Sequence, residues 1–169
     1  MNIFEKLFAW LGNNNEFCGY YPIVVKYKFV HPAAKAPFKA NPTDAGWDLS
    51  CISGPDVDED GNFVYHTGLA LEIPEGHVGL LFPRSSIAKK DMLLSNSVGV
   101  VDCHYRGEVL AKFKPYYCEV SKHEEYHIYE KGDRICQLIV IPILDVEMEE
   151  AAVLSKTDRG EGGYGSSGA

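Results

Sequence analysis

Five short segments of this sequence combine glycine, charged and hydroxyl residues in a way that the packing of a core does not require. They are residues 45–49 (AGWDL), 83–88 (PRSSIA), 96–108 (NSVGVVDCHYRGE), 132–138 (GDRICQL) and 159–168 (RGEGGYGSSG). Arginine side chains, hydroxyls and free backbone N–H groups are typical ligands of a phosphate chain. Asp102 ends an apolar run, so its carboxylate must lie exposed in a cleft or have a specific partner. The segments therefore indicate a site for a small anionic substrate.

Each segment also has a purely structural interpretation. Ser85 or Ser86 could cap the start of a helix instead of binding phosphate. Residues 106–108 could form only a hairpin turn and an ion pair. The last segment could be a linker, because Gly and Ser dominate it. Arg159 and Tyr164 are unusual in a linker, however, since they supply an anion clamp and a stacking plane.

The elements that must position these segments are expected to be strands. The chain has 169 residues and 18.8 kDa, which predicts one domain that buries a core without disulfides or metals. Nine prolines, sixteen glycines and many Val, Ile, Tyr and Phe residues favour short strands joined by turns. Strands or apolar runs are expected at residues 23–30, 46–52, 63–66, 69–73, 78–83, 92–101, 108–113 and 135–144. The pattern predicts an all-β sandwich, jelly roll or barrel.

Charge and cysteine content limit the class of protein. The net charge of −8 argues against a general nucleic-acid-binding protein, which needs a basic face. Five cysteines without a C-x-x-C pair indicate free thiols in a reducing, cytoplasmic compartment. Within the N-terminal extension (residues 1–22), residues 1–12 (MNIFEKLFAWLG) predict a short amphipathic helix that ends at residues 13–15 (NNN). Charged residues interrupt any run in it long enough for a signal peptide or a membrane span.

Two further patterns suggest metal sites, and neither is favoured. Residues 56–61 (DVDEDG) begin like a calcium loop, but the twelfth position is Thr67 where a bidentate carboxylate is required. A solvated hairpin turn is expected there instead. Cys118, His123 and His127 could suggest zinc, but no second cysteine lies nearby and the residues between them are charged.

In their order and spacing, the five segments closely resemble the five motifs of the trimeric dUTPase family (deoxyuridine triphosphate nucleotidohydrolases). The usual motifs read A-G-Y-D-L, P-R-S-G, G-V-I-D-x-x-Y-R-G-E, G-D-R-I-A-Q-L and R-G-x-G-G-F-G-S-T-G, and the resemblance covers about residues 24–168. It implies a distorted jelly-roll or β-barrel subunit over residues 23–154. An N-terminal extension (1–22) precedes this domain, and a glycine-rich, mobile C-terminal arm (155–169) follows it.

The resemblance implies an activity and an assembly. Members of the family hydrolyse dUTP to dUMP and pyrophosphate by attack of water on the α-phosphorus, which limits uracil incorporation into DNA and supplies dUMP for thymidylate synthesis. Mg²⁺ is expected to bind through the substrate phosphates and water, without a direct protein ligand. The implied assembly is a homotrimer, in which the first, second and fourth motifs come from one subunit, the third from a neighbour and the arm from the remaining one. No nucleic-acid or membrane partner is expected.

Site residues carry over from the motifs position by position. Asp102 matches the aspartate that orients and activates the attacking water. Tyr105 matches the tyrosine whose ring packs on deoxyribose and leaves no room for a 2′-hydroxyl. Asn96, with the backbone of the hairpin through Gly99 and Val101, matches the element that reads uracil.

The remaining motif positions are implied to serve the triphosphate chain. Its direct ligands are Arg84, Ser85, Ser86 and Gln137. The residues that organise these ligands are Asp48 and Arg134. The arm residues that close over the nucleotide are Arg159, Tyr164, Gly165, Ser166 and Ser167, where the aromatic ring stacks on uracil. The departures from the usual motifs include Trp47, Ser86, Cys136 and Tyr164, and none of these removes a reacting group.

Two alternatives remain beside dUTP hydrolysis. Deoxycytidine triphosphate deaminases, including bifunctional dCTP deaminase/dUTPases, share the fold and also carry an R-S-S sequence. They need a glutamate general base in the strand after the hairpin, whereas residues 109–113 (VLAKF) contain no carboxylate. A binding module without activity would be expected to have lost Asp102 or the arm. Hydrolysis of dUTP is therefore the favoured function.

Overall fold

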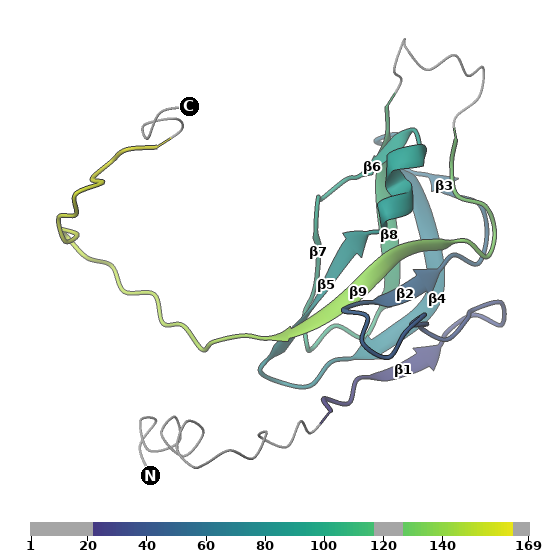
Figure 1. The fold of residues 1–169 in the computed structure, drawn as a ribbon, viewed down its shortest axis with the longest axis horizontal. Helices are drawn as coiled ribbons and strands as arrows, with labels where there is room; N and C mark the ends of the chain where they lie inside the picture. Colours follow the sequence, from purple (N-terminus) through teal and green to yellow (C-terminus); the bar gives the residue numbers. More distant parts are fainter. Residues whose placement is uncertain (1–21, 117–126, 164–169) are drawn as a thin grey trace.

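The computed structural model describes residues 22–116 and 127–163 of the chain. Within this part, the regular structure consists of nine strands and one short 3₁₀ helix, η1 (Ser85–Lys89) (Figure 1). The helix expected near the N-terminus falls on residues outside the described part. No helix in residues 22–116 or 127–163 is long and apolar enough to cross a membrane.

The strands form two antiparallel sheets, which confirms the all-β expectation. The first sheet has the order β1 (Lys26–Phe29), β4 (Phe63–Glu72), β8 (Glu108–Pro115) and β6 (Met92–Leu94), and β3 (Asp56–Val57) pairs with the start of β4. The second sheet has the order β2 (Trp47–Ser50), β9 (Arg134–Pro142), β5 (His77–Pro83) and β7 (Gly99–Val101). Sequential strands often belong to different sheets, as in a jelly roll.

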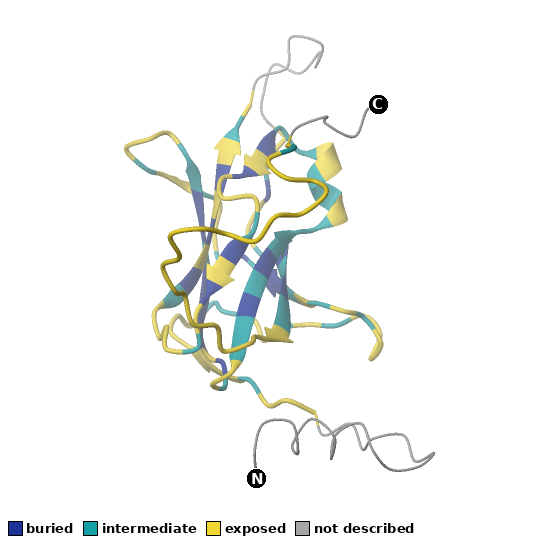
Figure 2. Ribbon diagram, turned by 90° about the vertical axis from the view of Figure 1, so that its left-hand side faces the viewer, coloured by how far each residue is buried: buried dark blue, intermediate teal, exposed yellow. Residues whose placement is uncertain are grey.

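The core lies between the two sheets and follows from the alternation along each strand. In β8, Val109, Ala111 and Phe113 are buried, whereas Leu110 and Lys112 are exposed on the opposite face. Figure 2 shows buried segments, in dark blue, between half-buried and exposed ones along the strands, and the buried side chains come from both sheets. Three aromatic rings pack edge to face in the core, with centroids 5.6–6.0 Å apart: Tyr65, Phe113 and Tyr129.

One strand differs from the sequence expectation. Separate strands are expected at residues 63–66 and 69–73, but the structure has the single strand β4. Its register with β8 shifts between His66 and Ala70, and Gly68 within this bulge has a φ of 68°. Because glycine adopts this left-handed conformation without steric cost, the chain bends at the bulge and continues in the same sheet.

The run expected at residues 92–101 forms two strands in different sheets. β6 belongs to the first sheet and β7 to the second, so the turn between them crosses from one sheet to the other. Ser97 in this turn has a φ of 60°, and the Val98 N–H donates to the Asn96 carbonyl at 2.6 Å. This tight crossing presents Asn96 at the edge of the cleft described below.

After β9, residues 143–163 form no strand and run away from the sheets (Figure 1). Their large apolar side chains are more than half exposed, at Ile143, Leu144, Val146, Met148, Val153 and Leu154. Large apolar side chains exposed together along one segment are unusual at the surface of a single soluble chain.

Candidate active site

A cleft of about 400 Å³ is lined by the β6–β7 turn, the loop after β7 and the outer face of β8. The structure brings together here all the residues of the third sequence segment that were expected to hold the nucleoside or to activate the attacking water. These residues are Asn96, Gly99, Val101, Asp102 and Tyr105.

Asp102 lies at the end of β7 and is exposed, as expected for a carboxylate that ends an apolar run. A tight turn follows, in which the Tyr105 N–H donates to the Asp102 carbonyl at 3.0 Å. This turn leads the chain away from the sheet, so Asp102 lies at the cleft and not in the core. A carboxylate in this place can accept a proton from a bound water.

Tyr105 folds back over Gly107. Its hydroxyl donates to the Glu108 carbonyl at 2.9 Å, and a Cβ atom at position 107 would overlap the ring and hydroxyl of Tyr105. The glycine is therefore required for this placement of the ring. The ring lines the cleft and is 46% exposed, so it offers an apolar face to a ligand.

The β6–β7 turn approaches β5 closely. A Cβ atom at Gly99 would lie 3.0 Å from the Leu81 Cβ and 3.5 Å from the Asn96 amide nitrogen. Glycine thus allows backbone and amide groups to line the cleft without a side chain between them. Fixed backbone donors and acceptors of this kind can distinguish bases, because a wrong base leaves a buried partner unpaired.

A second group of site residues surrounds Asp48 on β2. Its carboxylate accepts from Arg84 Nε at 2.8 Å and from Arg134 Nη1 at 3.0 Å, and its side chain is only 16% exposed. The shared carboxylate fixes both guanidinium groups at the same end of the second sheet. Two cations held together in this way suit a polyanionic ligand.

Gln137 and the two serines lie near the same end of that sheet. Gln137, on β9 directly opposite Asp48, donates through its amide to the Pro83 carbonyl at 3.2 Å. The N-cap of η1 is Arg84, so neither Ser85 nor Ser86 caps the helix, and the structure decides against that interpretation. Ser85 is exposed, and the Ser86 hydroxyl lies 3.2 Å from the hydroxyl of Tyr129.

Burial determines the ionisation of two groups beside this cluster. Burial raises the pKa of Tyr129, so its phenol stays protonated next to Ser86. Burial likewise raises the pKa of the Cys136 thiol, and the nearby Asp48 carboxylate adds to this effect. Both groups are therefore neutral near pH 7 and add no charge to the cluster.

The cleft and the Asp48 cluster remain two separate groups in a single chain, because Arg84, Arg134 and Gln137 are not among the residues that line the cleft. The arm is separate as well. Arg159 lies on the segment after β9, where its Nε donates to the Gly162 carbonyl at 2.9 Å. The other expected arm residues lie outside the described part of the chain, namely Tyr164, Gly165, Ser166 and Ser167.

Two interactions near the cleft differ from the sequence interpretation. The ion pair suggested within residues 106–108 is not the one formed, because the Glu108 carboxylate contacts His66 Nδ1 at 2.9 Å. Arg106 instead donates to the carbonyls of Cys103 and Tyr105. Sequence reasoning also did not assign Glu108, Leu110 and Lys112 to the cleft. Their spacing of two along β8 is the signal that places them on one face.

The metal patterns have structural explanations. Asp58 accepts hydrogen bonds from the backbone N–H groups of Asp60 and Asn62, and β3 pairs with β4, so residues 56–61 form the expected hairpin. Of the suggested zinc ligands, Cys118 and His123 lie outside the described residues, and the His127 N–H donates to Asp91. Among the described residues, no three His, Cys, Asp or Glu side chains group closely enough to hold a metal ion.

Comparisons with known proteins point to one family. Residues 33–168 match the dUTPase family model. The chain is 41% identical over 137 residues to the deoxyuridine 5′-triphosphate nucleotidohydrolase of Hydrogenobaculum sp., which covers 80% of this chain and 91% of that protein. It is 34% identical over 153 residues to the enzyme of the same name from Escherichia phage T5, which covers 86% of this chain and 99% of the phage protein.

Solved structures give the same result. The dUTPase of Staphylococcus bacteriophage 80alpha with dUPNHPP superimposes with a TM-score of 0.69 at 28% identity, over 86% of this chain and 99% of that one. A variant dUTPase of phage phi11 of S. aureus, described with a structural Mg(II) ion, has a TM-score of 0.64 over 79% of this chain and 99% of that one. At 22% identity, the second comparison supports the fold alone.

Proposed function

Because this chain belongs to the dUTPase family, we propose that the cleft at Asp102 is where it hydrolyses dUTP to dUMP and pyrophosphate. The proposal rests on one observation: the turn at Asn96, the ring of Tyr105 and the exposed carboxylate of Asp102 line the same cleft. These are the parts required to hold a nucleoside and to direct water at the phosphorus next to it.

Asp102 has the role of orienting and deprotonating the attacking water. A carboxylate can accept a proton as the water oxygen bonds to the α-phosphorus, and the leaving group is pyrophosphate. A positioned base of this kind contributes roughly 10²–10⁴-fold to the rate. The turn closed by the Tyr105 N–H supports the role, because it limits the directions in which residue 102 can point.

Arg84, Arg134 and Gln137 bind and orient the phosphate chain. A deoxyribonucleoside triphosphate carries about four negative charges, so catalysis depends on neutralising charge and on aligning water with the leaving group. The Asp48 carboxylate supports this role, because it holds both guanidinium groups before substrate arrives. Ser85 and Ser86 add hydroxyl donors at the start of η1.

The residues present fit a magnesium ion that arrives with the triphosphate. Mg²⁺ prefers oxygen ligands, keeps several waters and commonly binds through substrate phosphates with few carboxylates. The ion would be held by phosphate oxygens and water beside the cleft, which leaves the exposed Asp102 carboxylate available for the attacking water. When bound, the ion neutralises charge on the phosphate oxygens.

The active assembly is proposed to be a homotrimer. The apolar residues between Ile143 and Leu154 are exposed in the single chain and would be covered on a neighbouring copy. A segment that leaves its own sheets can carry Arg159 and the glycine-rich arm to a site on another subunit. Closed threefold symmetry would then complete three equal sites.

The location is proposed to be cytoplasmic. Cys51, Cys103 and Cys136 are free thiols, and two of them are buried in the core. Free structural cysteines are typical of reducing compartments. The substrate is also an intracellular nucleotide.

The deciding experiment measures release of pyrophosphate and of ammonia from dUTP and from dCTP. Pyrophosphate from dUTP without ammonia from dCTP is the expected result. The structure disfavours the deaminase, because Glu108, the carboxylate at the start of β8, already binds His66 and the Gly68 N–H. Ammonia release from dCTP would contradict the proposal.

A further inference from the structure

Tyr105 is positioned by the main chain of Glu108. Its hydroxyl donates to the Glu108 carbonyl at 2.9 Å, so the direction of the phenol depends on where β8 begins. The ring is half-exposed at the cleft, and it lies so close to Gly107 that a Cβ atom there would overlap it. A shift of the first residue of β8 would therefore move the ring with it.

The start of β8 lies opposite the bulge in β4, where the regular ladder is interrupted. His66 pairs with Leu110 and Ala70 pairs with Glu108, so three residues of β4 face one residue of β8. Side chains replace the missing ladder bonds. The Thr67 hydroxyl donates to the Val109 carbonyl at 2.7 Å, and the Glu108 carboxylate accepts from the Gly68 N–H at 2.7 Å.

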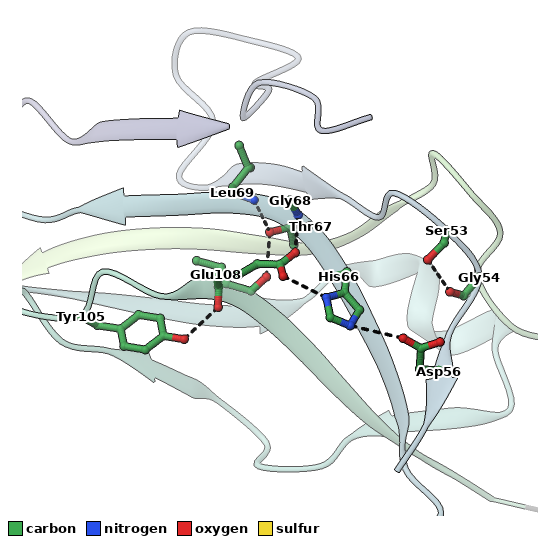
Figure 3. A network of polar contacts seen from close by, with 10 residues as sticks. Ser53, Gly54, Asp56, His66, Thr67, Gly68, Leu69, Tyr105 and Glu108 are labelled. Atoms are coloured by element: carbon green, nitrogen blue, oxygen red, sulfur yellow. Dashed lines mark hydrogen bonds and ion pairs between the residues drawn. The ribbon is translucent and has the colours of Figure 1, made fainter. Parts of the chain in front are cut away.

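Glu108 thus joins the bulge to the cleft through a single residue. Its carboxylate binds β4, and its carbonyl binds the Tyr105 hydroxyl (Figure 3). The side chain is 26% exposed, so the hydrogen bonds of its carboxylate are partly shielded from water. A charge-assisted hydrogen bond in such a place is stronger than a neutral one at the surface.

His66 holds the second oxygen of that carboxylate. Its Nδ1 lies 2.9 Å from Glu108 Oε2, and its Nε2 lies 3.4 Å from Asp56 Oδ2 on β3. Because the Glu108 carboxylate can only accept, Nδ1 is the donor of this contact. Figure 3 shows the resulting chain of contacts from Asp56 through His66 and Glu108 to Tyr105.

We propose that Glu108 and His66 are positioning residues for Tyr105, and that this pair sets how strongly the enzyme rejects a ribonucleotide. The proposal rests on the function proposed above, in which the Tyr105 ring packs against deoxyribose. Glu108 lines the cleft, but its carboxylate is already bound to the His66 imidazole and the Gly68 N–H. Glu108 and His66 act by holding the ring where a 2′-hydroxyl would collide with it.

The test compares kcat/KM for dUTP with kcat/KM for UTP, measured by pyrophosphate release. Displacement of a positioning group by about 1 Å can change a rate by roughly 10²-fold. Glu108→Ala should therefore lower the dUTP:UTP ratio by about 10-fold to 10²-fold. The loss should come mainly from faster turnover of UTP. His66→Ala should lower the ratio less, because the Gly68 N–H still binds Glu108.

Conservative variants separate positioning from folding. Glu108→Gln keeps an oxygen for the Gly68 N–H, and its amide can donate to His66 Nδ1 when the ring proton lies on Nε2, which faces Asp56. It should therefore restore most of the ratio. His66→Asn places an amide near the position of Nδ1 and should rescue His66→Ala. Glu72→Ala is the matched control. Glu72 lies on β4, the same strand as His66, and forms a surface ion pair with Lys26 at 2.8 Å.

A double-mutant cycle gives the sharpest outcome. Tyr105→Phe removes the hydroxyl that binds Glu108, so adding His66→Ala to it should change the ratio no further. An additional drop in the double variant would overturn the proposal, as would an unchanged ratio in Glu108→Ala. If Glu108→Ala does not fold, the His66 variants and the cycle still decide. Failure of the unmutated enzyme to hydrolyse dUTP would instead contradict the proposed function.

Discussion

At the scale of single residues, Asp102 has the clearest expected effect on chemistry. Asp102→Asn keeps the size of the side chain but removes the proton acceptor, so kcat for dUTP should fall by roughly 10²–10⁴-fold. Binding of a non-hydrolysable dUTP analogue should be nearly unchanged. Pyrophosphate release and a binding titration measure the two effects.

Asp60→Asn, in the exposed β3–β4 turn, serves as the control. Turnover within a few-fold of normal would remove Asp102 from the mechanism.

Asp48 should affect binding and stability together. Asp48→Ala leaves the guanidinium groups of Arg84 and Arg134 without their shared carboxylate. A hydrogen bond to a charged group contributes about 1.5–3 kcal/mol, and solvent screens the bond of Arg134, whose side chain is 40% exposed. The free energy of unfolding should therefore fall by roughly 2–4 kcal/mol. KM for dUTP should rise because the two cations are no longer aligned. Urea unfolding and steady-state kinetics would test this, and a loss of stability with an unchanged KM would show that the pair has only a structural role.

At the scale of elements, the β3–β4 hairpin should depend on acid. The backbone N–H of Asn62 lowers the pKa of Asp58 to about 2 from its ordinary value of 3.8, and the contact with Lys112 acts in the same direction. A group whose pKa is lower in the folded state stabilises the fold above its unfolded pKa. This contribution is lost as the pH falls from about 4 to about 2. The difference in unfolding free energy between the unmutated protein and Asp58→Asn should shrink over that range. A constant difference would contradict the role of this carboxylate.

The elements also show how far the sequence can predict this protein. The alternation of apolar and polar residues, together with the turn residues, is sufficient to predict the all-β class. The spacing of the third segment is sufficient to predict that Asp102 and Tyr105 lie in one cleft. The bulge at Gly68 could not be recognised, because a glycine inside an apolar run equally indicates the end of a strand. The partner of Glu108 could not be predicted either. It depends on the three-to-one register between β4 and β8, which exists only after the strands pair.

At the scale of the whole molecule, the segment after β9 should determine both assembly and activity. Three chains of 18.8 kDa give a trimer of about 56 kDa. Truncation after Lys156 removes Arg159 and the glycines but keeps the apolar residues between Ile143 and Leu154. The truncated protein should remain a trimer with nearly the same melting temperature. Its activity should fall on the order of 10²-fold or more, as when a charge-stabilising donor is removed.

Light scattering and differential scanning calorimetry would measure these properties beside pyrophosphate release. Tyr164→Ala should be milder than truncation, since it removes only stacking. An active monomer at working concentration would contradict the trimer. Normal turnover by the truncated protein would contradict the closing of the arm over the nucleotide.

The departure of residues 143–163 from their own sheets has a genetic consequence. If Asp102 and the arm of one site belong to different chains, two inactive alleles can complement each other. In trimers reassembled from equal amounts of Asp102→Asn and truncated chains, about one site in four would combine an intact Asp102 with an intact arm. Coexpression of the two nearly inactive variants should then recover roughly a quarter of normal activity. If each chain instead used its own arm, no mixture of the two alleles would regain activity.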